Sequence, residues 1–203
     1  MLLASTALAS EAISVPGPFT YVQTFDGLGT ATTPWVDDST IPGWIAGINA
    51  NNTPDGSLQA TNGIDAVPLS GLLNLGSAGA ADRALGSKAT SGGNFANIAF
   101  GVVFQNTSSQ PVIVTNISYT GELWRTNTTP GGLPEQWFVF YKTSASLISD
   151  VEPGTSSDTA AAGSFTLVPA LNWSSPTNQP EGSALDGNAA ANRSTICELR
   201  CHG

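Results

Sequence analysis

Residues 95–105 read FANIAFGVVFQ, and the expected fold rests on this stretch. Successive side chains of a β-strand point to opposite faces, so residues two apart share a face. One face then carries an unbroken apolar set, namely Ala96, Ile98, Phe100, Val102 and Phe104. The opposite face carries small or polar residues at positions 97, 99 and 101. The pattern predicts a strand with one face in the core.

The next two apolar segments, residues 112–125 (VIVTNISYTGELWR) and 135–143 (EQWFVFYKT), extend this interpretation. The first places Ile113, Ile117, Tyr119 and Leu123 on one face and mostly polar residues on the other, with Glu122 and Trp124 among them. In the second, residues 137–141 are apolar on both sides, as expected of a strand covered on both faces.

Further strands are predicted at the apolar runs between Gly, Pro and Asn turn residues, namely 19–25, 43–48, 57–61, 72–75 and 165–168. A single sheet would leave too much aromatic surface in water. We therefore expect an all-β fold, an antiparallel two-sheet β-sandwich of jelly-roll-like topology. A chain of 203 residues suits one such domain, expected over residues 19–193.

Both ends depart from this pattern. Residues 1–18 open with MLLASTALASEA, which resembles a signal-peptide remnant without its positive front, or else a flexible N-terminus. Residues 194–203 contain both cysteines and the single histidine of the chain, as Cys197, Cys201 and His202. No second ligand pair exists for a closed zinc site, so this segment is interpreted as an atypical, disordered tail.

The amino-acid composition argues against several classes of function. Charged residues make up 10% of the chain, the net charge is −9, and no cluster of Lys and Arg could neutralise a row of phosphates. Nucleic acid is therefore not an expected partner, and no apolar run is long enough for membrane insertion. Thiols and imidazole are absent before residue 197, which argues against a complete enzyme.

Five ordered segments resemble a family of secreted bacterial β-sandwich modules found in PEP-CTERM-sorted and autotransporter-like surface proteins. They are residues 24–28 (TFDGL), 41–44 (IPGW), 82–87 (DRALGS), 117–125 (ISYTGELWR) and 185–193 (LDGNAAANR). The resemblance covers about residues 20–193 and implies a secreted or cell-surface module without a catalytic set. After Arg193 the chain departs from the family pattern, which continues into closing strands, so we interpret it as C-terminally truncated. An open sheet edge is expected to favour association.

Candidate ligand-binding residues are aromatic side chains beside a carboxylate, namely Trp44, Glu122, Trp124 and Trp137, with Trp173 as a further aromatic. Such groups stack on sugar rings and accept hydroxyl hydrogen bonds. The alternative is that the tryptophans belong to the core and that Glu122 pairs with Arg125. Glu122 and Glu135 form the one carboxylate pair that strand positions allow for glycoside hydrolysis, and no catalytic residue is expected.

Structural polar roles are expected for seven residues: Asp82, Arg83, Arg125, Asp186, Asn188, Asn192 and Arg193. Calcium could bind at Asp37-Asp38 or in the Asp186-Gly187-Asn188 turn, but neither matches a full calcium loop, so no metal site or cofactor is assigned. The function expected from the sequence is a non-catalytic module with a structural, adhesive or display role. The alternative is a carbohydrate-binding module of a larger secreted hydrolase, with extracellular polysaccharide or cell-surface components as partners.

Overall fold

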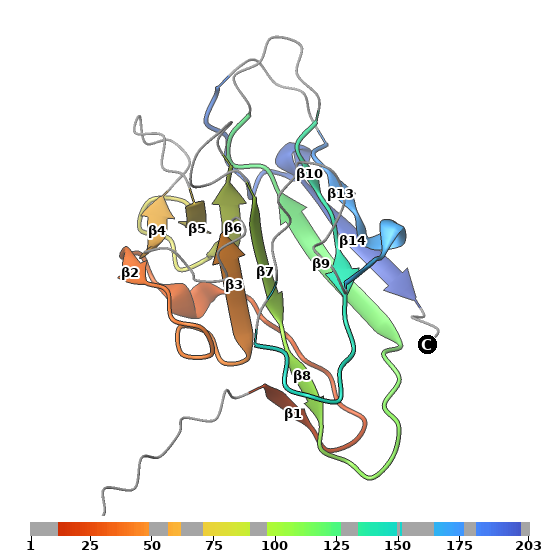
Figure 1. The fold of residues 1–203 in the computed structure, drawn as a ribbon. Helices are drawn as coiled ribbons and strands as arrows, with labels where there is room; N and C mark the ends of the chain where they lie inside the picture. The colour runs from red at the N-terminus through yellow and green to blue at the C-terminus, as the bar shows by residue number, and fades with distance from the viewer. Residues whose placement is uncertain are drawn as a thin grey trace, which may run out of the picture.

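The computed structural model describes residues 12–48, 57–61, 71–89, 97–126, 134–149, 151, 165–176 and 182–199. Over these residues the fold is all-β, built from several small and mostly antiparallel sheets (Figure 1). The described helical segments are three short 3-10 turns, η1 (Asp26–Leu28), η2 (Pro169–Leu171) and η3 (Ala190–Asn192). No described helix has the length and apolar character needed to cross a membrane.

The N-terminal half contributes two sheets. The first has four strands in the order β2-β4-β5-β6, with bounds Thr33–Pro34, Ser57–Thr61, Gly71–Leu75 and Ala84–Lys88. Strands β4 and β5 run parallel, and the other two pairings are antiparallel. The second sheet pairs β3 (Trp44–Ile48) with β7 (Ile98–Val102) in antiparallel register, so that Ala46 lies opposite Phe100.

The remaining described strands form four two-stranded sheets. Their strands are β1 (Ile13–Val15) with β8 (Phe104–Asn106), β9 (Asn116–Glu122) with β14 (Arg193–Leu199), β10 (Gln136–Trp137) with β13 (Trp173–Ser174), and β11 (Phe140–Tyr141) with β12 (Thr166–Leu167). Only the β1-β8 pair among these is parallel. The β9-β14 ladder joins seven residue pairs and lies beside β10 and β13 in Figure 1.

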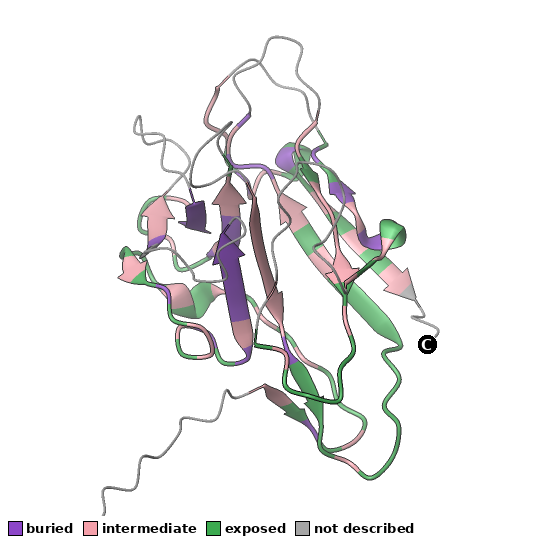
Figure 2. Ribbon diagram, in the orientation of Figure 1, coloured by how far each residue is buried: buried purple, intermediate pink, exposed green. Residues whose placement is uncertain are grey.

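The main core lies between the four-stranded sheet and the β3-β7 sheet. Its buried members come from both sheets and from the loop before β3, namely Trp35, Ile41, Ala46, Leu58, Leu72 and Leu85. Phe25, Leu28, Trp44, Ile98 and Phe100 pack against them. Figure 2 shows β3 and β5 as buried along most of their length. Burying each Leu or Ile side chain contributes about 2 kcal/mol, so this cluster is the main source of stability.

The predicted strands at 43–48, 57–61 and 72–75 are confirmed within one residue at each end as β3, β4 and β5. The strand predicted at 95–105 is interrupted, because it changes partner at Val103. The Val103 N–H donates to the Gly43 carbonyl, and its own carbonyl accepts from Ile13. The change also reverses the faces: Val103 is 9% exposed and Phe104 is 44% exposed, so Phe104 is not a core residue.

The predicted faces of 112–125 and 135–143 are partly wrong. Ile113 and Ile117 are exposed, whereas Trp124, expected on the polar face, is buried, because β9 is covered only towards its C-terminal end. Residues 135–143 do not form one middle strand: β10 and β11 are separate and pair with different partners. Tyr141 is exposed.

No strand forms at 19–25, although the sequence predicted one. The local backbone bonds to side chains instead of to a neighbouring strand: the Phe25 N–H donates to Gln23 Oε1, and Phe25 adopts a φ of 65°. The Tyr21 hydroxyl accepts a hydrogen bond from the Trp44 indole. This segment therefore packs through its rings rather than through a ladder.

Both expected end segments take part in the fold. Ile13–Val15 forms β1, so the ordered body begins before residue 19, while residues 1–11 lie outside the described part. The interpretation of 194–203 as a disordered tail is wrong for residues 194–199, which belong to β14 and pair along the whole of β9. Thr195 and Ile196 are good strand formers, and a complementary edge holds them. Cys201 and His202 lie outside the described residues.

Candidate functional site

A buried arginine and a buried asparagine form the most enclosed polar contact among the described residues. Arg83 is 5% exposed and Asn74 is 0% exposed. Arg83 Nε donates to Asn74 Oδ1 over 2.7 Å, and Arg83 Nη2 donates to the Asn74 backbone carbonyl. The pair joins the segment just before β6 to the middle of β5. Asparagine can serve here because its oxygen accepts while its amide donates elsewhere.

The same pair fixes the turn around η1. Asn74 Nδ2 donates to the carbonyls of Gly29, over 2.9 Å, and Leu28, over 3.4 Å. Asp26 Oδ1 accepts the Arg83 backbone N–H over 3.2 Å. Gly29 has a φ of 64°, which a glycine adopts without strain. Two sequence segments of the family resemblance, 24–28 and 82–87, therefore meet at one buried polar cluster.

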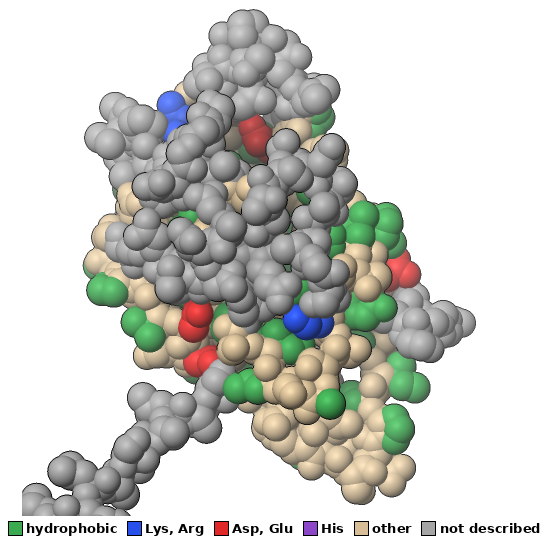
Figure 3. Space-filling view, viewed as in Figure 1, with side chains coloured by type: hydrophobic (Ala, Val, Ile, Leu, Met, Phe, Trp, Pro, Cys, Tyr) green, Lys and Arg blue, Asp and Glu red, His purple; other side chains and the backbone are tan. Residues whose placement is uncertain are grey.

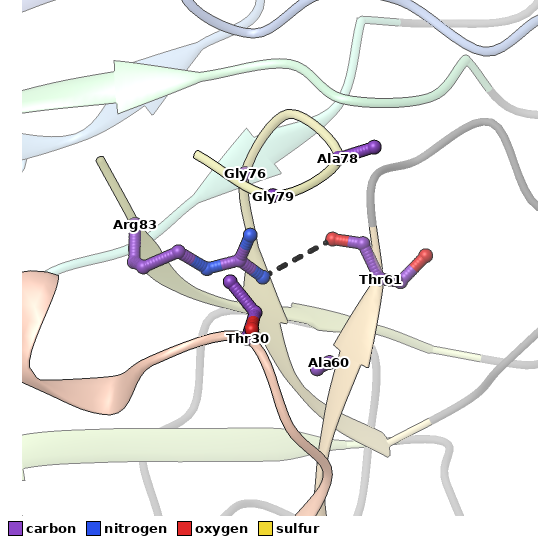
Figure 4. A pocket seen from close by; sticks show the side chains of 7 residues that line it. All are labelled: Thr30, Ala60, Thr61, Gly76, Ala78, Gly79 and Arg83. Atoms are coloured by element: carbon purple, nitrogen blue, oxygen red, sulfur yellow. Dashed lines mark hydrogen bonds between the residues drawn. The ribbon is translucent and has the colours of Figure 1, made fainter. Parts of the chain in front are cut away.

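A cavity of about 160 Å³ opens beside Arg83. Its lining comes from the loop after η1, the end of β4 and the turn between β5 and β6, and consists of Thr30, Ala60, Thr61, Gly76, Ala78, Gly79 and Arg83. Figure 4 shows the guanidinium between the Gly76–Gly79 turn and Thr61, with its bond to the Thr61 carbonyl. The lining is small and mostly uncharged, so Arg83 supplies its one formal charge.

Two of the predicted ligand residues, Trp44 and Trp137, pack against the same ring, that of Phe100. The ring centroids of Phe100 and Trp137 are 5.0 Å apart, and those of Phe100 and Trp44 are 6.4 Å apart. Phe25 continues the row, 5.0 Å from Trp44. Both tryptophans are half-buried. The row joins the main core to the β10 region. Its Phe25–Trp44 and Phe100–Trp137 contacts are edge-to-face, which is typical of packed aromatic rings.

The other two predicted ligand residues, Glu122 and Trp124, are close together but enclosed. Trp124 is 5% exposed, and its Nε1 donates to Glu122 Oε2 over 2.9 Å. A Cβ placed on Gly187 would collide with the Trp124 ring, so the 186–192 turn closes directly over it. Trp124 in this position offers no free ring face to a sugar. Trp173, at 1% exposed, is buried as well.

The ionisation of Glu122 reflects this enclosure. Burial raises the pKa of the Glu122 carboxyl above its usual range, and the nearby Asp82 and Asp186 raise it further, whereas the Trp124 hydrogen bond and Arg193 lower it. The expected pairing of Glu122 with Arg125 is not found in the described structure. Arg125 instead forms an isolated antiparallel β-bridge with Ala184 through its backbone. Burial lowers the pKa of Lys88, and the positive charge of Arg125 lowers it further.

The 186–192 turn is held by its own polar residues. Asp186 Oδ1 accepts the Asn188 N–H over 3.0 Å, and the Asp186 carbonyl accepts from Asn192 Nδ2 over 2.8 Å. The Asn192 carbonyl in turn accepts the Leu123 N–H. These contacts are those of an Asx turn, in which Asp186 and Asn192 take part through their side chains and Asn188 through its backbone N–H. Arg193 is exposed and begins β14.

Asp37, from the other candidate calcium position, also bonds to groups within the fold. Asp37 Oδ1 accepts the Trp35 indole N–H over 2.6 Å and the Ala46 N–H over 2.9 Å, which ties the loop before β3 to that strand. Over the described ranges, no group of three or more His, Cys, Asp and Glu side chains is placed to hold a metal ion.

The sequence interpretation missed Asn74 and the cavity. Asn74 sits in the apolar run GLLNL, and its only signal is that a single polar residue interrupts a buried strand. Nothing in the sequence places Thr30, Thr61 and Gly76 together, because they come from three separate segments that meet only in the folded sheet. Comparison of the chain with protein-family models, with curated proteins and with solved structures gave no match.

Proposed function

We propose that this chain is a non-catalytic module of secreted or cell-surface proteins, with a structural, adhesive or display role. The proposal rests on the observation that polar side chains of the described residues form their hydrogen bonds to groups inside the fold. The Arg83-Asn74 pair, the Asp37 carboxylate and the Glu122 carboxylate each satisfy buried backbone or indole groups. A side chain that forms such a buried hydrogen bond stabilises the fold.

Architecture and surface support the same proposal. The core shared by the four-stranded sheet and the β3-β7 sheet is what a two-layer sandwich of jelly-roll type requires. On the face drawn in Figure 3, described acidic and basic side chains are few, and much of the described surface is formed by other side chains and by the backbone. Such a surface, on a chain of net charge −9, suits an exported domain.

Cell-surface location is tested by protease treatment of intact cells that naturally make the protein. The proposal expects digestion without lysis, because the module faces outward, and a cytoplasmic control protein should survive in the same sample. Digestion only after lysis would contradict the proposal.

The alternative function, carbohydrate binding, would depend on Trp44 and Trp137, since these are the half-buried members of the predicted aromatic set. A glycan array distinguishes the two functions. Retention on one glycan that Trp137→Ala abolishes, with the fold intact by circular dichroism, would favour the alternative. An array without retention favours the structural role. Turnover on glycoside or ester panels that Glu122→Gln abolishes would contradict both.

A further inference from the structure

Arg83 is a buried cation whose bonds go to uncharged oxygens. The three hydrogen bonds of its guanidinium are to Asn74 Oδ1, the Asn74 carbonyl and the Thr61 carbonyl. Within the described part of the chain, no carboxylate forms an ion pair with its guanidinium: Asp26 accepts only the backbone N–H of Arg83. A buried charge that forms no direct ion pair is costly, because nearby charges offset its desolvation only in part.

One nitrogen of the guanidinium remains available. Nε and Nη2 make the bonds just described, whereas Nη1 donates to none of the described residues. A Cβ placed on Gly76 would collide with Nη1, so the Gly76 backbone packs closely against one side of this nitrogen. Figure 4 shows the guanidinium at the wall of the cavity, beneath the Gly76–Gly79 turn. The cavity therefore presents N–H donors on a cation.

Size and charge limit what could bind there. The volume of about 160 Å³ is close to that of an engineered cavity of about 150 Å³ that holds one benzene, so a small organic group fits. Burial lowers the pKa of Arg83, and Asp82 raises it by less, so the negative charge nearby offsets the cost of burial only in part. A monoanion matches one cation. A dianion such as phosphate would meet the nearby Asp82 and Asp26 with no second cation in the lining.

We infer that the Arg83 cavity binds a carboxylate group, carried by a small organic acid or by an acidic sugar. The carboxylate accepts a charge-assisted hydrogen bond from Arg83 Nη1, and the rest of the ligand lies against the small lining residues Ala60, Ala78 and Gly79. The site does not depend on the proposed surface role, because its geometry is set by β4, β5, β6 and the η1 turn alone.

The test is a titration of the ¹⁵N-labelled protein, followed by amide and Arg83 Nε–H chemical shifts, with acetate, glucuronate, glucose and inorganic phosphate. Saturable shifts at Gly76, Gly79 and Arg83 are expected with acetate and glucuronate, and none with glucose. Glucuronate that binds about tenfold tighter than acetate identifies an acidic sugar as the ligand, whereas equal binding identifies small organic acids. Both patterns support the inference.

The matched variants are Ala78→Leu, which adds bulk to an exposed residue of the lining, and Ala81→Leu, which adds the same bulk to an exposed residue outside the lining. Ala78→Leu should weaken acetate and glucuronate binding at least about tenfold, and Ala81→Leu should leave it unchanged. Should Ala78→Leu fail to fold, Thr30→Leu fills the cavity from the loop after η1. The inference is overturned if neither carboxylate gives saturable shifts up to about 100 mM, if glucose or phosphate binds as well as acetate, or if a folded cavity-filling variant binds like the parent.

Discussion

Asn74 shows how much of this fold depends on single polar residues. Its side chain is fully buried in an apolar strand, yet it bonds to Arg83 on one side and to the turn at Gly29 on the other. Hydrophobic periodicity predicts where the strand lies and gives no information on this partner, because hydrogen-bond partners depend on tertiary placement. A structural role of Arg83 was predictable from the donor chemistry of a scarce arginine, whereas that of Asn74 was not.

Asn74→Ala should destabilise the protein by about 3 kcal/mol, because the Arg83 guanidinium and the Gly29 carbonyl would both lose a buried partner. Urea unfolding followed by tryptophan fluorescence measures the change. Gln105→Ala, on the exposed strand β8, is the control and should change stability by less than about 0.5 kcal/mol. Equal midpoints for Asn74→Ala and the parent protein would show that the pair contributes nothing.

Glu122 provides a pH-dependent prediction. Because burial raises its pKa in the folded state, the folded protein binds more protons than the unfolded chain between the ordinary glutamate pKa and the raised value. The contribution of Glu122 to stability therefore falls as pH rises through this window. Glutamine keeps an oxygen acceptor for the Trp124 indole and carries no charge.

The stability of Glu122→Gln relative to the parent should accordingly rise as the pH increases above the ordinary glutamate pKa. Urea midpoints of both proteins at several pH values measure the difference. A difference that is constant with pH, or that moves in the opposite sense, would mean that Glu122 is not enclosed as described. Asp186→Asn is not a suitable control, because Asp186 acts on the same carboxyl.

At the scale of elements, β14 is the largest departure from the sequence interpretation. The prediction of a disordered tail rested on Cys197, Cys201 and His202, although strand-forming residues such as Thr195 and Ile196 precede them. Its partner β9 was predictable as a strand, but the pairing of Arg193 with Glu122 and of Ile196 with Tyr119 joins segments far apart in the chain. By contrast β3, β4 and β5 were predictable, since each is a short buried run between turn residues.

The contact between β13 and β14 gives a direct test of this placement. Trp173 Nε1 donates to Ser194 Oγ over 2.9 Å while the Trp173 ring is 1% exposed, and a Cβ on Gly121 would collide with that ring. Ser194→Ala should cost about 1 to 2 kcal/mol, because a buried indole N–H would lose its acceptor.

A double-mutant cycle isolates this contact. Trp173→Phe removes the donor, so Ser194→Ala made in that background should cost clearly less, with a coupling of about 0.5 kcal/mol or more. Stability in urea is the measured quantity. Strictly additive effects of the two substitutions would contradict the Trp173-Ser194 hydrogen bond and with it the packing of β14 on the body.

For the whole molecule, composition predicted the all-β class correctly, because few charged residues and many turn residues favour strands. The sequence could not give the division into several small sheets, which follows from local events such as the partner change at Val103 and the φ of Phe25. The sequence could not predict the Arg83 cavity either, because its lining comes from three separate segments that meet only in the folded structure. The secreted role and its partners remain predictions of the family resemblance.

The central claim is that one β body extends from β1 to β14 and uses its polar side chains to hold itself together. Native-state hydrogen exchange, resolved by residue with NMR, tests it most directly. The account predicts slow exchange of ladder amides in β3, β5, β7, β9 and β14, with the amides of residues 194–198 protected together with those of β9. Random-coil exchange over residues 194–198, alongside protection elsewhere, would contradict it.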